Sequence, residues 1–599
     1  MSIRSSALRT TVAAVAAISM GAVAFTPAAV GPASTSLTSS ALEALPIIDE
    51  EKRAELGADW FETFLDTADG ERLYATVMVP TGTDLTDNDV NLPVVAVVSP
   101  YLGYESFTGH GPSDRFLDLI EGAELIKNGY AVVQVSTRGS GGSSGCLDIL
   151  GPGEQLDTVT AVEWAASQPW SNGRVGLYGK SYDGNTGAFA VANQPVGLAA
   201  VVAQAIAPDR YRGSYGDKAR LVQSIAYPGV SYGAGGEASY SSEAPIEYNT
   251  NSAARAADCQ ALLAEHYVPE ESLDFWRIRD AVDRVGINGS DVPTFVTAGY
   301  ADTNTNIGAG AAEFFQQLKG DGHHLWIGWW DHVRGNDVES DGSLAMGRDG
   351  FFDAVMGFYD ENLKGIVGAD REVTVAAQSN DGSWREEASY PSDDAVPLRI
   401  DLKSGSYTDD GVGRGSNDSS IGAGGVVNTG TAGEGGIWSI TPPLPQDLRI
   451  AGVPSAELFL SGVPGANVAV NVYDIAPDGT ALFLTRGVGN VDVSVTAGPA
   501  GYETVALFAT DGIVRAGHRI GVFVQDVNTE AFIHTPTGTD VTVISGVVRL
   551  QAVAIDRGNE LRGVTNNTLE SFRTTAEFDA SSHVTAANEV STFVAPRFR

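Results

Sequence analysis

Cysteine, histidine and methionine are scarce in this sequence, with 2, 8 and 5 residues among 599, and basic residues are outnumbered. The 37 lysines and arginines face 75 acidic residues, which gives a formal net charge of −38. Such a surface repels phosphate backbones and excludes nucleic acid as a partner. Charged residues at 19% and hydrophobic residues at 43% exclude a disordered chain or a coiled coil. The length exceeds what one compact core supports, so we expect two or more domains.

Long apolar runs are also lacking. The first ten residues carry Arg4 and Arg9, residues 11–24 form a short run rich in alanine and valine, and small residues follow. This order is typical of a secretory signal peptide, and the run is shorter than the ~20 residues of a membrane-spanning helix. We therefore expect residues 1–34 to be a signal peptide and leader. The mature chain should be secreted, extracellular or in the cell envelope, with no membrane contact after cleavage.

Export changes the interpretation of the two cysteines, Cys146 and Cys259. They lack the close spacing of a metal site, and we predict no metal ligands. An even pair in an oxidising compartment is usually bridged, so we expect a disulfide between them. It would close a loop worth roughly 4–5 kcal/mol in the chain-entropy model.

From about residue 58 to 367, short apolar runs alternate with helical patterns. The runs lie at 92–99, 131–136, 175–178, 199–204, 294–298 and 325–329, and the amphipathic stretches include 116–127, 155–167 and 309–318. This alternation predicts an α/β fold, in which a mostly parallel sheet is covered on both faces. Residues 209–285 interrupt it and predict a helical insertion, with a helix at 246–265.

From about residue 371 the helical patterns end. A Gly/Ser/Asp-rich stretch at 405–436 predicts a long irregular loop. Short alternating strands are predicted at 456–461, 468–475, 481–488, 503–508, 519–524 and 542–550. We expect an all-β sandwich, of jelly-roll type.

Ser181 lies at the apex of a strand–turn–helix pattern. The strand at 174–178 runs into Gly-Lys-Ser-Tyr-Asp-Gly at 179–184, and small residues typical of a close-packed helix follow. This is the context of a nucleophile elbow, although Asp183 stands where the common G-x-S-x-G pattern has its last glycine. Ser181 is our candidate nucleophile, and the N–H of Tyr182, at the helix start, is a candidate oxyanion donor.

A serine nucleophile needs an acid and a histidine base, which follow it in that order in α/β-hydrolases. Active residues of an open α/β sheet gather at the carboxyl ends of strands. His332 follows the last predicted strand of the sheet, whereas the histidines at 323–324 precede it. Asp302 lies just past the strand at 294–298, whereas Asp291 precedes that strand. We therefore predict His332 as the base and Asp302 as the acid.

Three other patterns have structural interpretations. Residues 138–145 faintly resemble a dinucleotide-binding loop but lack its third glycine in register. Lys180 adjoins Ser181, but adjacent side chains in a turn diverge, which argues against a Ser–Lys dyad. Trp329 and Trp330 could line a pocket, but large aromatics near a strand end are more often core.

Taken in order, these residues resemble the X-prolyl dipeptidyl-peptidase and cocaine-esterase group of serine hydrolases. The matching motifs are Gly-Lys-Ser-Tyr-Asp-Gly at 179–184, Gly-Tyr-Ala-Asp-Thr at 299–303, Ile-Gly-Trp-Trp-Asp-His at 327–332, Thr-Arg-Gly at 137–139, Gln-Pro-Trp at 168–170 and Asn-Leu-Lys-Gly at 362–365. The resemblance implies an α/β-hydrolase domain at 45–370, a helical cap at about 209–290 and a jelly-roll domain at 371–599. It also implies a tyrosine hydroxyl in the oxyanion hole, here Tyr101.

The expected reaction is acyl transfer through an acyl-enzyme, which requires no metal and no organic cofactor. The resemblance favours release of Xaa-Pro dipeptides from peptide N-termini. A carboxylesterase or amide acylase would use the same triad, and a non-catalytic protein that binds glycan or cell wall is a hypothesis of another class. We expect a small peptide or ester as substrate and allow for a homodimer.

Overall fold

The computed structural model of the chain describes residues 50–599 except 88, 103–112, 114, 222–245, 254–258, 260–264, 306–309, 412–432, 492–499, 527–531, 533, 576–577, 597 and 599. The predicted signal peptide and leader at 1–34 lie outside the described residues. Among the described helices, none combines the length and apolarity needed to cross a membrane.

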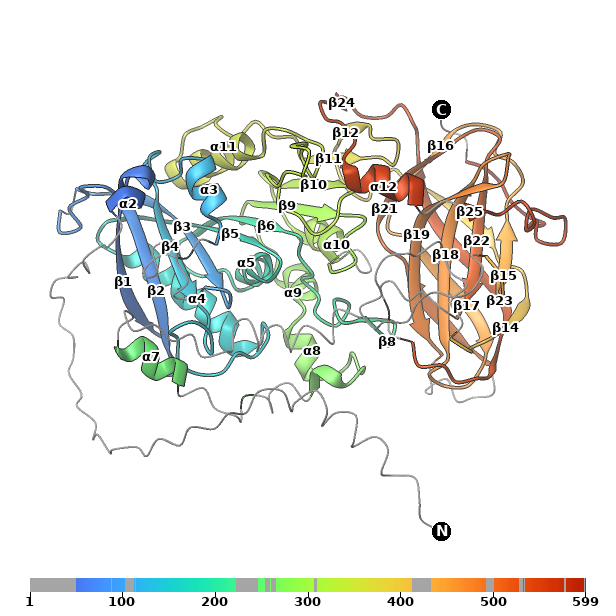
Figure 1. The fold of residues 1–599 in the computed structure, drawn as a ribbon, viewed down its shortest axis with the longest axis horizontal. Coiled ribbons are helices and arrows are strands. Elements are labelled where there is room, and N and C mark those ends of the chain that lie inside the picture. The colour runs from blue at the N-terminus through green and yellow to red at the C-terminus, as the bar shows by residue number, and fades with distance from the viewer. Residues whose placement is uncertain are drawn as a thin grey trace, which may run out of the picture. The chain divides into compact units, whose positions relative to one another are not determined.

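An 11-stranded mixed sheet organises the first part of the chain, in the order β1-β2-β4-β3-β5-β6-β9-β10-β11-β12-β24 (Figure 1). Neighbours from β4 to β11 pair in parallel, as predicted from the alternating pattern, and the outer pairs are antiparallel. The strands are β1 Ala58–Asp66, β2 Arg72–Pro80, β3 Leu92–Ser99, β4 Ala131–Ser136, β5 Ser171–Lys180, β6 Leu198–Gln204, β9 Thr294–Gly299, β10 His324–Gly328, β11 Val375–Gln378, β12 Trp384–Glu387 and β24 Glu560–Leu561.

Helices cover both faces of this sheet because its strands are apolar on both sides. In β3, Val94, Ala96 and Val98 belong to one buried cluster, and Val95 and Val97 belong to the other. The first cluster also contains residues of α4 Pro152–Ser167, α5 Tyr182–Asn193, α9 Ala281–Asn288 and α10 Gly310–Gln317. The second contains residues of α2 Glu50–Leu56, α3 Leu117–Gly122 and α11 Phe351–Lys364. The parallel, doubly covered sheet predicted from the sequence is confirmed.

The insertion between β6 and β9 is described in part. It contains β7 Tyr215–Gly216 paired with β8 Ala219–Arg220, and the helices α7 Ile246–Ala253, α8 Asp274–Ile278 and α9. The helix predicted at 246–265 is described as helical over its first eight residues, and most of its second half lies outside the described residues.

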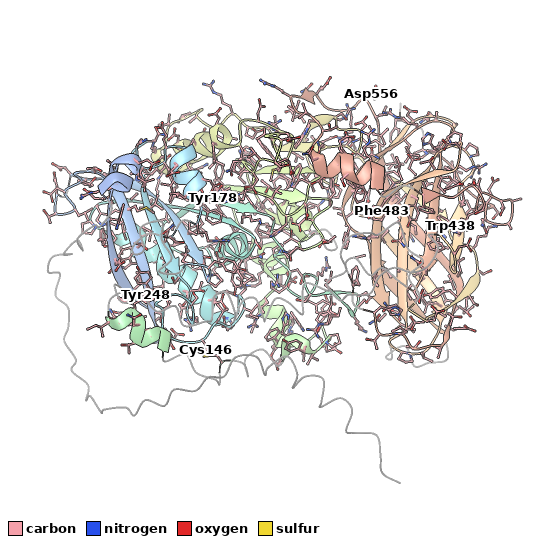
Figure 2. All side chains as sticks on the ribbon, in the orientation of Figure 1. Cys146, Tyr178, Tyr248, Trp438, Phe483 and Asp556 are labelled. Carbon is pink, nitrogen blue, oxygen red and sulfur yellow. A yellow bond between two sulfur atoms is a disulfide. The ribbon has the colours of Figure 1, made fainter. Side chains whose placement is uncertain are left out.

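A sandwich of antiparallel strands follows, as predicted. One sheet has the order β20-β17-β23-β16-β21, with β13 and β14 also pairing β23, and the other has the order β15-β22-β18-β19-β25. Side chains from both sheets share one buried cluster, whereas Trp438, labelled in Figure 2, stacks on Phe523 with ring centroids 4.6 Å apart. The strands are β13 Val396–Asp401, β14 Gly405–Thr408, β15 Ile437–Ile440, β16 Leu448–Gly452, β17 Ser455–Ser461, β18 Asn467–Ile475, β19 Thr480–Asn490, β20 Ala500–Ala506, β21 Thr510–Val514, β22 Arg519–Gln525, β23 Asp540–Val553 and β25 Phe578–Asp579.

We expected the chain after residue 371 to form only strands and loops of a separate sandwich, and two features differ from this expectation. Helix α12, Asn567–Thr575, begins where the side chain of Asn566 accepts a hydrogen bond from the Leu569 N–H at 2.9 Å, and buried Leu569 packs into the sheet's first cluster. Strands β11, β12 and β24 join the large sheet although they follow residue 370. The domain boundary at 370 stays a prediction.

Candidate active site

Ser181 occupies the turn between β5 and α5 with a backbone φ of 65° and ψ of −119°. A positive φ is costly for a residue with a Cβ and marks a strained turn. The adjoining glycines are required by space. A Cβ at Gly179 would lie 2.2 Å from the backbone of Asp183, and a Cβ at Gly184 would lie 2.7 Å from the Gln204 carbonyl oxygen. The turn therefore needs glycine at 184 and tolerates Asp183 in the preceding position.

Asp302 and His332 lie beyond the carboxyl ends of the adjacent parallel strands β9 and β10. His332 Nδ1 is 2.8 Å from Asp302 Oδ2, so the ring donates its Nδ1 proton to the carboxylate. The Asp302 side chain is fully buried, and that of His332 is 21% exposed. The structure thus brings together the predicted acid and base.

Three further donors hold the Asp302 carboxylate. The backbone N–H groups of Asn304 and Thr305 donate to Oδ1 at 2.9 and 3.1 Å, and the Thr305 hydroxyl donates to Oδ2. Burial raises the pKa of Asp302, but the charge and hydrogen bond of His332, together with the other hydrogen bonds, outweigh it and keep the pKa below its usual value. Asp302 therefore stays ionised beside the imidazole.

Gln204, at the end of β6, links the Ser181 turn to the segment after His332. Its carbonyl oxygen accepts from the Ser181 N–H at 2.9 Å, and its side-chain Oε1 accepts from the Gly335 N–H at 2.9 Å. Gln204 is fully buried. Gln204 thereby fixes the Ser181 turn and the segment after His332 at the same edge of the sheet.

The second ring nitrogen of His332 points away from Asp302. Its Nε2 lies 3.4 Å from the Asn304 side-chain nitrogen. In the described part of the chain, the Ser181 hydroxyl has no hydrogen-bond partner. Sequence reasoning missed Asn304, Thr305 and Gln204. Backbone N–H groups two and three residues after an aspartate are typical of an Asx turn, which could have indicated the first two.

Tyr101, the residue expected in the oxyanion hole, lies beside the turn. Its ring is 5.9 Å from the Tyr182 ring in an edge-to-face contact, and the Arg115 guanidinium lies 4.6 Å over the Tyr101 ring. Arg115 Nε in turn donates to Asp183 Oδ2 at 2.5 Å. Burial, with the nearby charge of Asp183, raises the pKa of Tyr101 to about 12, so its hydroxyl keeps its proton at neutral pH.

The side chain of Tyr182 has a separate structural role. Its hydroxyl donates to the buried Glu154 carboxyl and accepts from the Leu150 N–H at 3.2 Å. Burial raises the pKa of Glu154 well above its usual value. The candidate oxyanion donor at this position is thus the backbone N–H of Tyr182, which begins α5.

The residues of the other sequence patterns take part in structural contacts. Arg138 donates through Nε and Nη2 to Asp157 of α4 and through Nη1 to Asp69, at 2.8–3.1 Å, which ties the turn after β4 to a neighbouring turn and helix. Trp329 and Trp330 are 2% and 1% exposed. Both tryptophans therefore belong to the core.

Cys146 and Cys259 are bonded in the structure, with their Cα atoms 5.4 Å apart. The bond joins the segment after β4, where Figure 2 labels Cys146, to the insertion after β6.

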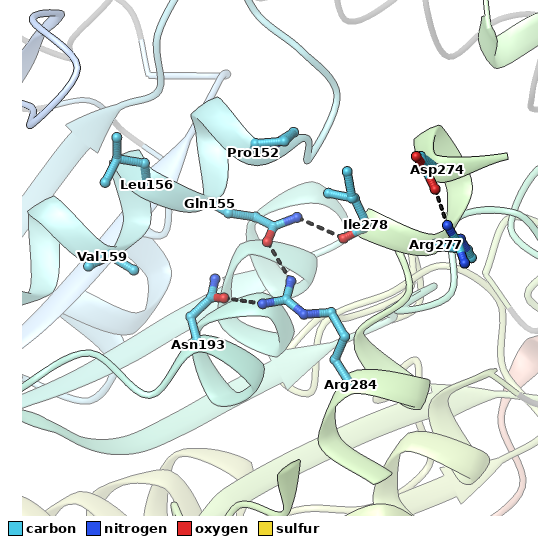
Figure 3. A pocket seen from close by; sticks show the side chains of 9 residues that line it. All are labelled: Pro152, Gln155, Leu156, Val159, Asn193, Asp274, Arg277, Ile278 and Arg284. Carbon is cyan, nitrogen blue, oxygen red and sulfur yellow. Dashed lines mark hydrogen bonds and ion pairs between the residues drawn. The ribbon is translucent and has the colours of Figure 1, made fainter. Parts of the chain in front are cut away.

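A separate pocket of about 770 Å³ lies between α4 and the helices α8 and α9 (Figure 3). Arg284 projects into it and donates to the side-chain oxygens of Gln155 and Asn193. None of the predicted site residues lines it; its walls are Pro152, Gln155, Leu156, Val159, Asn193, Asp274, Arg277, Ile278 and Arg284.

Comparisons with known proteins cover both parts of the chain. Residues 69–334 match the profile of X-Pro dipeptidyl-peptidase (S15 family), and residues 367–561 match that of the X-Pro dipeptidyl-peptidase C-terminal non-catalytic domain. A cocaine esterase from Rhodococcus sp. (strain MB1 Bresler) is 25% identical over 528 residues, which cover 77% of this chain and 89% of the esterase. A Streptomyces avermitilis protein, named for a proposed Xaa-Pro dipeptidyl-peptidase activity, is 24% identical over 80% of each chain.

Solved structures show the same fold. An aminopeptidase from the marine sediment archaeon Thaumarchaeota archaeon superposes with a TM-score of 0.62 at 19% identity, over 86% of this chain and all of that one. The doubly covered sheet and the sandwich define an α/β-hydrolase with a C-terminal β domain. The chain belongs to the X-Pro dipeptidyl-peptidase and cocaine-esterase family of serine hydrolases.

Proposed function

We propose that the chain hydrolyses acyl substrates with Ser181 as nucleophile, His332 as base and Asp302 as the acid that orients the base. The observation that carries this proposal is the 2.8 Å hydrogen bond from His332 Nδ1 to the buried Asp302, next to a strained serine turn that Gln204 ties to the same edge. A histidine fixed through Nδ1 presents Nε2 as the basic nitrogen.

The reaction then takes two displacement steps. Ser181 Oγ attacks the substrate carbonyl carbon while His332 Nε2 takes the hydroxyl proton, and Asp302 stabilises the resulting imidazolium. The imidazolium returns that proton to the leaving nitrogen or oxygen as the acyl-enzyme forms. Water attacks the acyl-enzyme in the same manner and releases the acid and free Ser181.

The tetrahedral intermediate needs donors for its oxyanion, and we assign them to the Tyr101 hydroxyl and the Tyr182 N–H. The raised pKa of Tyr101 keeps its donor proton in place. Arg115, which lies over the Tyr101 ring and is held by Asp183, acts as a positioning residue for this hydroxyl. Donors fixed before the reaction stabilise the developing charge without reorganisation.

For the substrate we propose peptides with an N-terminal Xaa-Pro sequence, cleaved by a secreted enzyme. Both matching profiles carry the X-Pro dipeptidyl-peptidase name, and so does the Streptomyces relative. The signal-like residues at 1–34 and the disulfide support export. A carboxylesterase is the second candidate, because the cocaine esterase is similar over most of the chain.

The test compares Gly-Pro p-nitroanilide, its N-acetylated form and p-nitrophenyl butyrate as substrates of the native protein and of Ser181→Ala. Turnover of the free anilide with at least ten-fold loss on acetylation would identify a dipeptidyl-peptidase that recognises the terminal ammonium. Turnover of the ester alone would replace the peptidase with the esterase. Activity retained in Ser181→Ala would contradict both candidates.

A further inference from the structure

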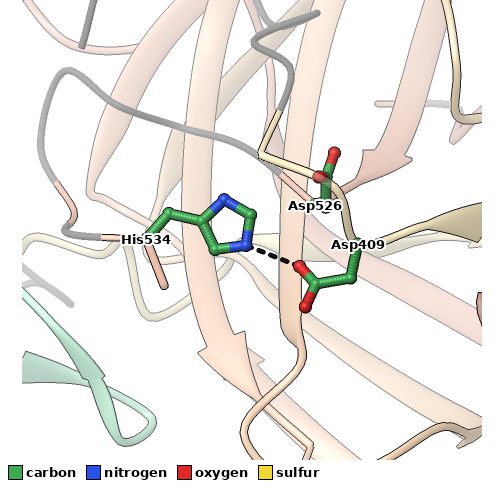
Figure 4. A group of neighbouring side chains, drawn as sticks. All are labelled: Asp409, Asp526 and His534. Carbon is green, nitrogen blue, oxygen red and sulfur yellow. Dashed lines mark hydrogen bonds and ion pairs between the residues drawn. The ribbon is translucent and has the colours of Figure 1, made fainter. Parts of the chain in front are cut away.

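Two carboxylates and an imidazole converge in the sandwich, away from the candidate active site. Asp409 follows β14, Asp526 follows β22, and His534 comes from the segment before β23. Figure 4 shows the three side chains grouped at one point, and one ligand atom from each lies within 4.8 Å of the other two. Three separate segments of the chain therefore meet here.

This cluster buries negative charge. Asp409 and Asp526 are fully buried, and the His534 side chain is 4% exposed. Across the described residues, no lysine or arginine forms an ion pair with either carboxylate. A buried carboxylate is costly without a compensating cation, and two carboxylates beside one imidazole leave such a deficit.

Two polar atoms of the cluster form no hydrogen bond with the described residues. Asp526 Oδ1 and His534 Nδ1 are buried and have no hydrogen-bond partner in the described part of the chain. The Oδ2 atom of each carboxylate is held by groups outside the cluster. Asp409 Oδ2 accepts from the Thr537 N–H and hydroxyl at 2.8 and 2.6 Å, and Asp526 Oδ2 accepts from the Gly411 N–H at 2.9 Å. Outer hydrogen bonds of this kind orient carboxylates that bind metals.

A second His–Asp pair of the same domain provides a comparison. His518 Nδ1 lies 2.8 Å from Asp474, and the His518 side chain is 23% exposed. That pair is not part of a group of three metal-binding side chains within the described residues. The buried third ligand, Asp526, distinguishes the Asp409–Asp526–His534 cluster from an ordinary His–Asp hydrogen bond.

We propose that Asp409, Asp526 and His534 bind a divalent transition-metal ion of the zinc type. One imidazole nitrogen with two carboxylate oxygens suits Zn²⁺, and a 2+ ion neutralises both carboxylates. The ion replaces the hydrogen bond between His534 Nε2 and Asp409 Oδ1, which are 2.5 Å apart, and the two atoms separate to about 3 Å so that each reaches zinc at a normal bond length. Its role is to join the ends of β14 and β22 to the segment before β23. This site is independent of the proposed hydrolase function.

In the test, the full chain is treated with EDTA, incubated with Zn²⁺ and desalted. Its zinc content is then measured by inductively coupled plasma mass spectrometry. We expect stoichiometric zinc in the native protein and in the control His518→Gln, with little or none in Asp526→Asn and His534→Gln. Zn²⁺ should also raise the unfolding temperature of the native protein and of the control, because it binds the folded state. No zinc in the native protein, or equal zinc in native protein and His534→Gln, would overturn the proposal.

A measurement on the native protein alone covers the case in which the variants do not fold. Co²⁺ replaces Zn²⁺ in sites of this type, and protein-bound Co²⁺ gives visible absorption bands when its coordination number is low. We expect these bands after Co²⁺ addition and their loss on Zn²⁺ addition. Absence of these bands in the native protein would refute the site.

Discussion

The α/β region and the sandwich both contain a hydrogen bond from a partly exposed histidine to a buried aspartate. His332–Asp302 in the first region and His518–Asp474 in the second have the same separation of 2.8 Å. The neighbourhoods differ, because His332 lies at an edge that also carries the strained Ser181, whereas Asp474 and His518 lie on or beside antiparallel strands. The distance within such a pair therefore does not identify a catalytic site.

The arrangement of strands explains the difference. Parallel strands bring all their carboxyl ends to one edge, so the residues after β5, β6, β9 and β10 meet there. Antiparallel neighbours place alternate ends together, so residues that follow successive strands separate. Convergence in the sandwich, as at Asp409 and Asp526, depends on individual loops.

The largest contrast should come from neutralising the acid of each pair. Asp302→Asn should lower kcat roughly 10⁴-fold, because the amide no longer fixes the imidazole tautomer. Asp474→Asn, the matched change in the sandwich, should leave kcat within about two-fold. Steady-state kinetics on both variants, with circular dichroism for folding, measure the contrast. Equal losses would mean that the two pairs do not differ as described.

Removal of the Tyr101 hydroxyl should have the next largest effect. Tyr101→Phe should lower kcat about 10²–10³-fold, as expected for loss of one oxyanion donor. Because burial raises the pKa of Tyr101 to about 12, the ratio of native to variant rates should stay constant from pH 7 to 10. An ordinary tyrosine would be half ionised near pH 10, and the ratio would then fall about two-fold.

The disulfide should stabilise the α/β region and its insertion. Replacing Cys146 and Cys259 together by alanine should lower the free energy of unfolding by about 2–5 kcal/mol, since the bond closes a long loop. Urea unfolding monitored by residual hydrolysis reports on this region. A stability equal to that of the native chain would show that the bond does not constrain the unfolded state.

The smallest expected effect concerns the positioning of Tyr101. Asp183→Asn should lower kcat roughly ten-fold with little change in KM, because Arg115 loses the carboxylate that holds it over the Tyr101 ring. The same change made in Tyr101→Phe should have almost no effect on kcat. Additive losses in the double variant would assign Asp183 a role unconnected with Tyr101.

Sequence patterns predicted the sheet because buried parallel strands are apolar on both faces, as in β3 and β4. The rule that active residues follow carboxyl ends then indicated Asp302 and His332, which the structure joins. Catalysis by these residues stays a prediction.

Sequence patterns could not predict the long-range side-chain contacts. Gln204 binds a backbone group 131 residues away, and Arg115 binds Asp183 across 68 residues, with no local signal for either contact. His534 and Asp409 are 125 residues apart. Helix α12 was missed because its apolar positions, Leu569 and Phe572, amount to a single helical turn in a polar stretch.

Reaction with a fluorophosphonate probe tests the central claim, that Ser181 is an activated nucleophile, without assuming a substrate. The probe is added to the native protein and to Ser181→Ala and His332→Ala, and the modified residue is located by peptide mass spectrometry. We expect one adduct, on Ser181, that is absent from Ser181→Ala and strongly slowed in His332→Ala. An adduct on another residue that persists in Ser181→Ala would contradict the assignment of Ser181, and no adduct at all would favour a non-catalytic protein.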